Sequence, residues 1–215
     1  MLVRRALFGG TFDPVHHGHL AAAGSVREAL AIEDFRFLPA GSPPHRAGTY
    51  ASGPQRLRML ELALEERPEF AIDHRELLRP GPSYMSDTLA SVRGAYPDDA
   101  LILVLGQDAL NSLDRWHDWR RIPKLSHLAV MTRPGETPAY SDPLAQVLEA
   151  GLVGGMGRLA AEQAGAIVPV AVTPMDISST ALRAEVGNPR RLRHFVPDAV
   201  AAYIEAEGLY GLSDL

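Results

Sequence analysis

Short, mainly apolar runs recur along the chain, and stretches with a helical pattern separate most of them. The runs occupy residues 6–8, 35–38, 70–72, 101–105, 128–131 and 167–170. Each has the length of a strand, and strands that alternate with helices are typical of a parallel sheet covered on both faces. The pattern therefore predicts an α/β fold with a Rossmann-like, doubly wound parallel sheet, and 1–215 is expected to form a single domain.

Helix ends are indicated at three places. Ser52 and Ser141 each precede a proline by two residues, and serine caps helices whose first turn tolerates proline. A third helix is expected to run from Pro197 and to close at Gly208. The helix after Ser52 carries leucines at helical spacing that we expect to be buried, namely Leu57, Leu60 and Leu64.

The composition of the 215 residues narrows the functional classes. The formal net charge is −5 and there is no cysteine, which argues against a general nucleic-acid binder, a disulfide framework, a thiol nucleophile and a cysteine zinc site. No apolar run reaches the roughly 18 residues that a membrane span needs, and the first run ends at a glycine turn, unlike a secretory signal. We expect a cytoplasmic location with no nucleic-acid and no membrane partner, while the oligomeric state stays open.

The segment after the first apolar run carries the features of a phosphate site. Gly9 and Gly10 end the run, and His16 and His19 flank Gly18 where a helical stretch begins. Glycines allow backbone N–H groups to approach an anion, and a helix start adds unsatisfied donors and the positive end of its dipole. Both imidazoles lie near one face of the first turn. The alternative is a glycine-rich turn with histidines that only happen to precede a helix.

The string at 9–19, Gly-Gly-Thr-Phe-Asp-Pro-x-His-x-Gly-His, resembles the signature of the nucleotidyltransferase superfamily with the His-x-Gly-His motif. A second string, Ile-Ser-Ser-Thr-x-x-Arg at 177–183, resembles a segment of the same superfamily, although a serine there can also act only as a helix cap. The resemblance implies ATP contacts from both strings, at Gly9, Gly10, Thr11, Phe12, Gly18, His19, Ile177, Ser178, Ser179, Thr180 and Arg183.

Two further segments follow predicted strands and are similar to parts of the same superfamily. His45 and Arg46 stand where many members carry His-Lys, so the resemblance implies that they hold the triphosphate, with His16, His19 and Arg46 as the catalytic set. Read without the resemblance, the proline-rich segment around His45 is a stiff surface connection. Gly106 and Asp108 are further ATP candidates; Asp108 either binds a ribose hydroxyl or orients a metal-bound water.

The segment 81–89, Gly-Pro-Ser-Tyr-Met-Ser-Asp-Thr-Leu, resembles one in bacterial nicotinate-nucleotide adenylyltransferases, with Met85 in place of the family's threonine. The Trp-His-Asp-Trp string at 116–119 resembles that family's Trp-(Tyr/His)-x-Trp pattern. Trp116 is expected to stack on the pyridine ring, and Trp119 to be a core residue. The resemblance implies nicotinate mononucleotide contacts at Asp13, Ser83, Tyr84, Met85, Trp116, His117 and Arg133.

The reaction that this family implies joins ATP and nicotinate mononucleotide, giving deamido-NAD and pyrophosphate. Mg²⁺ is expected to enter with ATP, and no protein metal ligands are assigned, because the sequence shows no carboxylate cluster that would form a dedicated cage. The alternatives are another superfamily member, such as phosphopantetheine adenylyltransferase or a cytidylyltransferase, a catalytically silent nucleotide sensor, and a non-specific nucleic-acid binder, which the acidic charge opposes.

Overall fold

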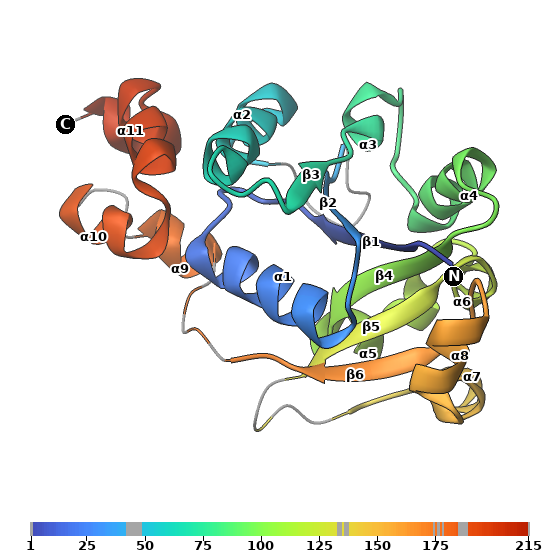
Figure 1. Cartoon of the computed structure of the whole chain (residues 1–215). Coiled ribbons are helices and arrows are strands. Elements are labelled where there is room, and N and C mark those ends of the chain that lie inside the picture. Colours follow the sequence, from blue (N-terminus) through green and yellow to red (C-terminus); the bar gives the residue numbers. More distant parts are fainter. Residues whose placement is uncertain are drawn as a thin grey trace.

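The computed structural model contains one parallel sheet, and each of the six predicted runs forms one of its strands. The structure describes residues 2–41, 49–132, 135, 138–173, 175, 177, 179–184 and 189–214. The strands follow the order β3-β2-β1-β4-β5-β6 (Figure 1). Their bounds are β1 Arg4–Gly10, β2 Asp34–Pro39, β3 Phe70–Ile72, β4 Ala100–Gly106, β5 His127–Thr132 and β6 Ile167–Ala171.

The strand order reverses at the middle of the sheet, between β1 and β4, and we call the edge at the carboxyl ends of these two strands the crevice edge. From β1 the chain moves outward through β2 to β3, and then returns to place β4 on the other side of β1. In such doubly wound sheets, ligands bind beyond the carboxyl ends of the strands at the point where the order reverses. The carboxyl ends of β1 and β4, at Gly10 and Gly106, therefore mark the expected site.

Helices connect the strands and continue beyond the last one. Their bounds are α1 His17–Ala29, α2 Gly53–Leu64, α3 Arg75–Leu78, α4 Met85–Ala95, α5 Gln107–Asn111, α6 Ile122–Leu125, α7 Asp142–Leu152, α8 Gly155–Ala161, α9 Ser179–Ala184, α10 Pro189–Phe195 and α11 Asp198–Ala206. Short 3₁₀ turns lie at Leu113–Arg115, Trp119–Arg121 and Leu209–Asp214. Within the described part of the chain, no helix has both the length and the apolar character needed to cross a membrane.

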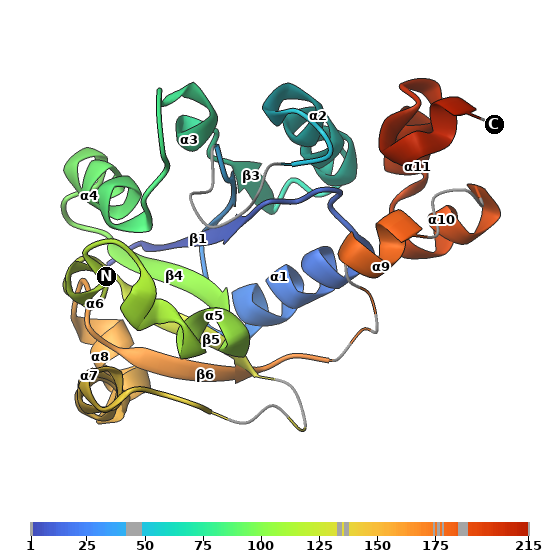
Figure 2. The same ribbon diagram turned by 180° about the vertical axis from the view of Figure 1, so that it is seen from behind.

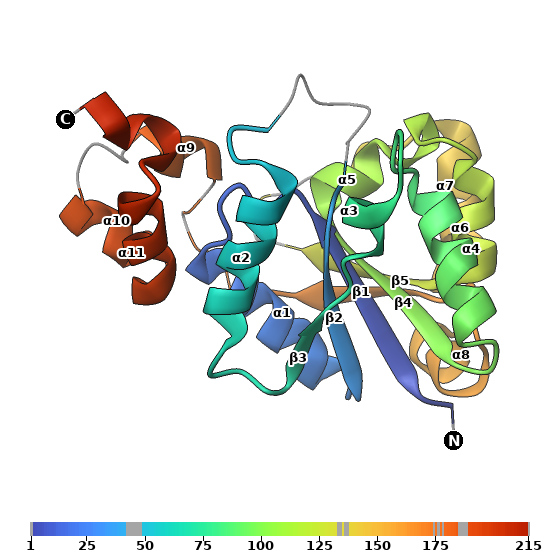
Figure 3. The ribbon, with the colours of Figure 1, turned by 90° about the horizontal axis from the view of Figure 1, so that it is seen from above.

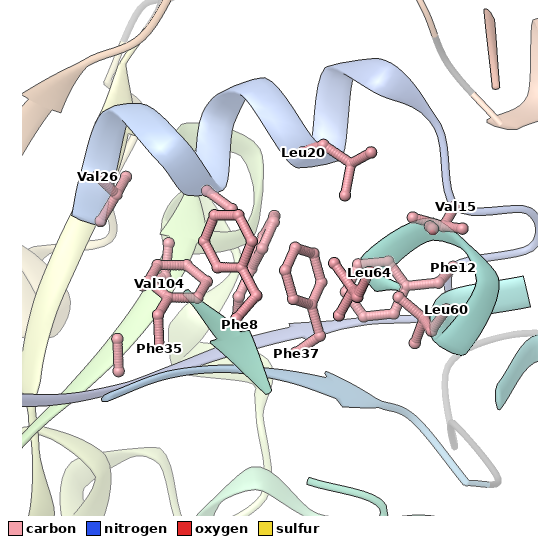
Figure 4. Packing of buried hydrophobic residues seen from close by; sticks show 14 of the residues in the cluster. Phe8, Phe12, Val15, Leu20, Val26, Phe35, Phe37, Leu60, Leu64 and Val104 are labelled. Carbon is pink, nitrogen blue, oxygen red and sulfur yellow. The ribbon is translucent and has the colours of Figure 1, made fainter. Parts of the chain in front are cut away.

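Helices cover both faces of the sheet, and successive side chains of each strand point to opposite faces. Phe8 of β1 and Val104 of β4 face α1 and α2 in the first core cluster, whereas Leu7 and Leu103 face α4 to α7 in the second core cluster. Figure 4 shows the first side, where a cluster of phenylalanines lies beneath Leu20 and Val26 of α1. The second helical layer is turned into view in Figure 2. This arrangement confirms the predicted doubly wound fold.

Helix α2, which follows Ser52, buries a charged residue that its apolar sequence pattern did not predict. Ser52 caps α2 in a reciprocal box with Gln55, as its position predicts. The buried face, however, includes Arg56, which is only 1% exposed, while Leu57 is half-buried. Leu57 thus lies at the margin of the buried face, and the helix also turns the charged Arg56 inward. The other buried positions are Met59, Leu60, Ala63 and Leu64.

The C-terminal helices gather beside α2 and the start of α1 (Figure 3). Helix α11 packs against α2, and its Val200 and Ile204 are fully buried. The predicted closure at Gly208 is confirmed, because Gly208 takes a φ of 59° directly after the helix. The chain is thereby brought back, near its C-terminus, to the end of the sheet where β1 stops.

Candidate active site

The turn from β1 to α1 is shaped by close contacts at its glycines. Phe12 has a φ of 50° and a buried ring that folds back over the turn. A Cβ atom on Gly10 would lie 2.8 Å from that ring, and one on Gly9 would lie 3.0 Å from Cε of Met85. Gly10 therefore makes room for the Phe12 ring, whereas at Gly9 the flexible end of Met85 would have to shift slightly. The turn carries Thr11, Phe12 and Asp13 across the crevice edge of the sheet.

His16 and His19 form a reciprocal cap at the start of α1. Nδ1 of His16 accepts the backbone N–H of His19, and Nδ1 of His19 accepts the backbone N–H of His16, both at 3.3 Å. A neutral imidazole that accepts at Nδ1 carries its proton on Nε2. The cap therefore fixes the tautomer of both rings as Nε2–H donors.

Packing fixes the orientation of the same two rings. They stack on each other with centroids 3.6 Å apart, and the His19 ring stands edge to face with Phe12 at 5.1 Å. A Cβ on Gly18 would lie 3.0 Å from Nδ1 of His16, so the third glycine of the motif makes room for the pair. The structure thus places two oriented imidazoles at a helix N-terminus, as an anion site requires.

The β4 side contributes a second turn at the same edge of the sheet. Gly106 ends β4 and precedes α5, and a Cβ there would lie 2.7 Å from Oδ1 of Asp108. The Asp108 side chain is exposed. Because β4 is the direct neighbour of β1, the sheet brings Asp108 to the edge that also carries Gly10. Its predicted role, with ribose or with a metal-bound water, stays a prediction.

Several candidates for the mononucleotide meet near the start of α4. The rings of Tyr84 and His117 pack against each other at a tilt of 31° with centroids 4.3 Å apart, although the two residues lie 33 positions apart in the sequence. Ser83 is buried and its Oγ has no hydrogen-bond partner among the described residues. Trp116 is half-buried against the second core cluster, and Trp119 is buried as predicted.

Helix α9 directly contacts the turn after β1, residues 11–14, which we call the motif turn. Oγ of Ser179 donates to the carbonyl of Pro14 at 3.1 Å, and Nη1 of Arg183 donates to the carbonyl of Asp13 at 2.6 Å. The two strings that resemble one superfamily are therefore adjacent in space. Ile177 is half-buried against the first core cluster.

Some predicted residues fall where the structure gives no description. His45, Arg46, Arg133 and Ser178 lie outside the described residues, as does the Thr180 side chain. Their expected contacts with the triphosphate or the mononucleotide stay predictions.

Asp13 has its described partners within the protein. Its carboxylate accepts the backbone N–H groups of Tyr50, at 2.7 Å, and Ala51, at 3.1 Å, and the hydroxyl of Tyr210 at 2.8 Å. Burial, together with the charge of Asp13, raises the pKa of Tyr210, which keeps this hydroxyl a donor. A contact between Asp13 and the mononucleotide stays a prediction.

Arg56 is the site neighbour that sequence reasoning missed. Its Nη1 donates to the carbonyl of Thr11 at 2.8 Å and its Nη2 to the carbonyl of Gly41 at 3.3 Å. Burial lowers the pKa of the guanidinium, while the charge of Asp13 acts in the opposite direction. A charged residue one helical turn before Leu60, within an apolar stripe, was the signal in the sequence.

A second buried carboxyl lies beside the end of β2. Glu76 accepts a hydrogen bond from Thr88 at 2.7 Å, and Arg79 donates to the same Thr88 hydroxyl at 2.9 Å. Burial raises the pKa of Glu76, although the bond from Thr88 acts in the opposite direction. The bond from Thr88 to Glu76 ties α4 to α3.

Comparison with known proteins defines the class first. The chain matches the family model described as Cytidylyltransferase-like over residues 7–185, a span that includes both motif strings. The fold and the paired imidazoles at a phosphate-type turn agree with that class.

Relatives then define the family. A protein of Methylococcus capsulatus named "Probable nicotinate-nucleotide adenylyltransferase" is 45% identical over 95% of this chain and 98% of its own length. One of the same name from Marinobacter nauticus is 41% identical over 95% of both chains. The chain therefore belongs to the nicotinate-nucleotide adenylyltransferase family, which confirms the resemblance seen in the sequence.

A solved structure agrees on the fold. The nicotinic acid mononucleotide adenylyltransferase of Plasmodium falciparum, complexed with NaAD, superposes with a TM-score of 0.74 at 11% identity. The match covers 97% of this chain and 98% of the other. At that identity the likeness concerns the arrangement of strands and helices.

Proposed function

We propose that this chain transfers the adenylyl group of ATP to nicotinate mononucleotide, giving deamido-NAD and pyrophosphate in the synthesis of NAD. The observation that carries the proposal is the reciprocal cap of His16 and His19 at the start of α1, in a chain of this family. The proposal treats 1–215 as one nucleotidyltransferase domain in the cytoplasm.

The chemistry requires alignment more than activation. An oxygen of the mononucleotide 5′-phosphate attacks the α-phosphorus of ATP; the new P–O bond forms while the bond to the β-phosphate oxygen breaks, and pyrophosphate leaves. The attacking oxygen is already charged, so little help from a base is needed. His16 and His19 would donate to the α- and β-phosphates, where charge grows in the transition state.

The pyrophosphate side is assigned to the second motif. Ser178, Ser179, Thr180 and Arg183 would hold the β- and γ-phosphates together with Arg46. The support is the docking of Ser179 and Arg183 on the 11–14 turn, which joins both motifs at one edge of the sheet. The planar fork of an arginine side chain such as that of Arg183 suits phosphate oxygens.

The mononucleotide side is assigned to the start of α4 and the 116–118 segment. The first backbone N–H groups of α4, at Met85 and Ser86, precede the intrahelical ladder, and no side chain caps this end at Tyr84. These donors suit the nicotinate carboxylate, and Trp116 would stack on the pyridine ring. Phosphopantetheine has neither a carboxylate nor a pyridine ring, and this difference favours nicotinate mononucleotide over phosphopantetheine as the acceptor.

Mg²⁺ is proposed to arrive with ATP. No group of three or more acidic, histidine or cysteine side chains that could hold a metal occurs among the described residues. Asp108 is exposed near the crevice and would contact the ion through water. The bound ion would neutralise charge on the leaving pyrophosphate.

The test is a matrix of donors and acceptors. The protein is incubated with Mg²⁺, with ATP or CTP as donor, and with nicotinate mononucleotide, phosphopantetheine or no acceptor; pyrophosphate and product mass are then measured. The proposal expects deamido-NAD only with ATP and nicotinate mononucleotide. Turnover with phosphopantetheine or CTP would indicate another superfamily reaction, and binding of ATP without turnover would indicate a sensor.

A further inference from the structure

Two buried side chains, Asp13 and Arg56, and the half-buried Tyr210 hold the turn after β1, and we call them the Asp13 cluster. Asp13 is 3% and Arg56 is 1% exposed. They come from the turn after β1, from α2 and from the segment after α11. Because the positive Arg56 lies close to the negative Asp13, each offsets the cost of burying the other.

The cluster fixes the motif turn through the backbone and not through the ligand. Arg56 holds the carbonyl of Thr11, while the Asp13 carboxylate holds the N–H groups of Tyr50 and Ala51. Arg56 also holds the carbonyl of Gly41. The cluster therefore ties the turn after β1 to the chain on both sides of the 42–48 segment.

Tyr210 adds a connection from the far end of the chain. Its hydroxyl donates to Oδ1 of Asp13 across 197 positions of sequence, and its ring lies 6.5 Å from that of Tyr50. The turn that receives this bond leads directly into His16. Any displacement of the turn would move the His16 and His19 donors relative to the phosphates.

We propose that Arg56 and Tyr210 are positioning residues for the adenylyl transfer, holding residues 11–14 so that His16 and His19 meet the transition state. This inference rests on the proposed function. Neither residue contacts the reacting atoms in this account. Since a shift of about 1 Å in a reacting group can cost about a hundredfold in rate, loss of one of the three described bonds to the Asp13 carboxylate should cost about tenfold.

The decisive variant is Tyr210→Phe, which removes one hydroxyl and keeps the ring. Its matched control is Tyr203→Phe, which makes the same change on α11, at a residue that packs on the same core cluster and is not among the described partners of Asp13. We expect Tyr210→Phe to lower kcat about tenfold with both KM values within about threefold, because the bond orients transition-state donors. Tyr203→Phe should leave kcat unchanged.

Arg56 supplies an independent comparison. Arg56→Met removes both carbonyl contacts and should lower kcat about a hundredfold, with Arg56→Lys in between, since an ammonium cannot form the same fork. Arg58→Met on the exposed face of α2 is the control. Should Arg56→Met fail to fold, the Tyr210→Phe result decides alone.

Hydrogen exchange separates this inference from the proposed function. In Tyr210→Phe, the amides of Tyr50 and Ala51 should exchange faster than in Tyr203→Phe, a result that needs no substrate. Wild-type protein that makes no deamido-NAD overturns the proposed function; a folded Tyr210→Phe with the kcat of its control, or with only its KM changed, overturns the positioning role.

Discussion

Two roles of His19 can be separated by isosteric substitution. Its Nδ1 accepts the N–H of His16 and closes the cap, while its Nε2–H is assigned to the phosphates. An asparagine places its Oδ1 near the position of Nδ1 but has nothing at Nε2. His19→Asn should therefore keep the cap and lose the donor, whereas His19→Ala loses both.

The magnitudes follow from these contacts. Loss of a helix cap costs about 1 kcal/mol, and loss of the ring contacts with Phe12 and His16 about 1 kcal/mol more. His19→Ala should lose about 2 kcal/mol of unfolding free energy, and His19→Asn about half of that. Both should lower kcat by about 100- to 1,000-fold, the usual cost of removing one donor to developing charge.

The assay is pyrophosphate release at saturating ATP and nicotinate mononucleotide, beside urea unfolding of each variant. His19→Gln, which offers an N–H near the Nε2 position, should retain more activity than His19→Asn. A His19→Asn protein with kcat within threefold of wild type would refute the donor role and leave His19 as a cap alone.

Three further predictions concern the surroundings of the site. Arg93→Met should lower the free energy of unfolding in urea by about 3 kcal/mol and leave kcat in the turnover assay unchanged. The reason is that Arg93 donates to five backbone carbonyls at the edge of the sheet opposite the crevice edge. Burial lowers the pKa of His127, so the neutral ring stabilises the fold fully above about pH 6.5, and this contribution falls as the pH drops below that value. The fall in unfolding free energy should vanish in His127→Gln, and a pH profile identical to that of the wild type would contradict this reasoning. Gly10→Ala should push on the ring of Phe12 and lower kcat at least tenfold. Gly24→Ala, with open space around it, should stabilise α1 by about 0.5–1 kcal/mol. Equal kcat values in the two variants would contradict the prediction for Gly10.

Much of the fold could be predicted because local pattern and tertiary structure agree. The buried run 101–105 forms the centre of β4, and Gly208 ends the last helix as glycine does elsewhere. Short elements such as α3 and α6 gave no periodic pattern, since one helical turn is too short to show a period.

The candidate site was predictable only where residues act locally. The spacing of His16 and His19 across a helix start indicates their shared face, and the structure adds that they cap each other. The bond from Tyr210 to Asp13 and the clamp of Arg56 on Gly41 depend on contacts between distant segments. No spacing in the sequence reports those contacts, because packing of α2 and α11 creates them.

The most direct test of the proposed function is the ratio of two kcat/KM values, one for nicotinate mononucleotide and one for nicotinamide mononucleotide, measured with saturating ATP and Mg²⁺. The N–H groups at the start of α4 can pair with a carboxylate, whereas the amide NH₂ would face donors and leave them unpaired. We expect a preference for the acid of at least about a hundredfold, despite Met85 in place of threonine. Equal efficiency with the two mononucleotides would contradict it.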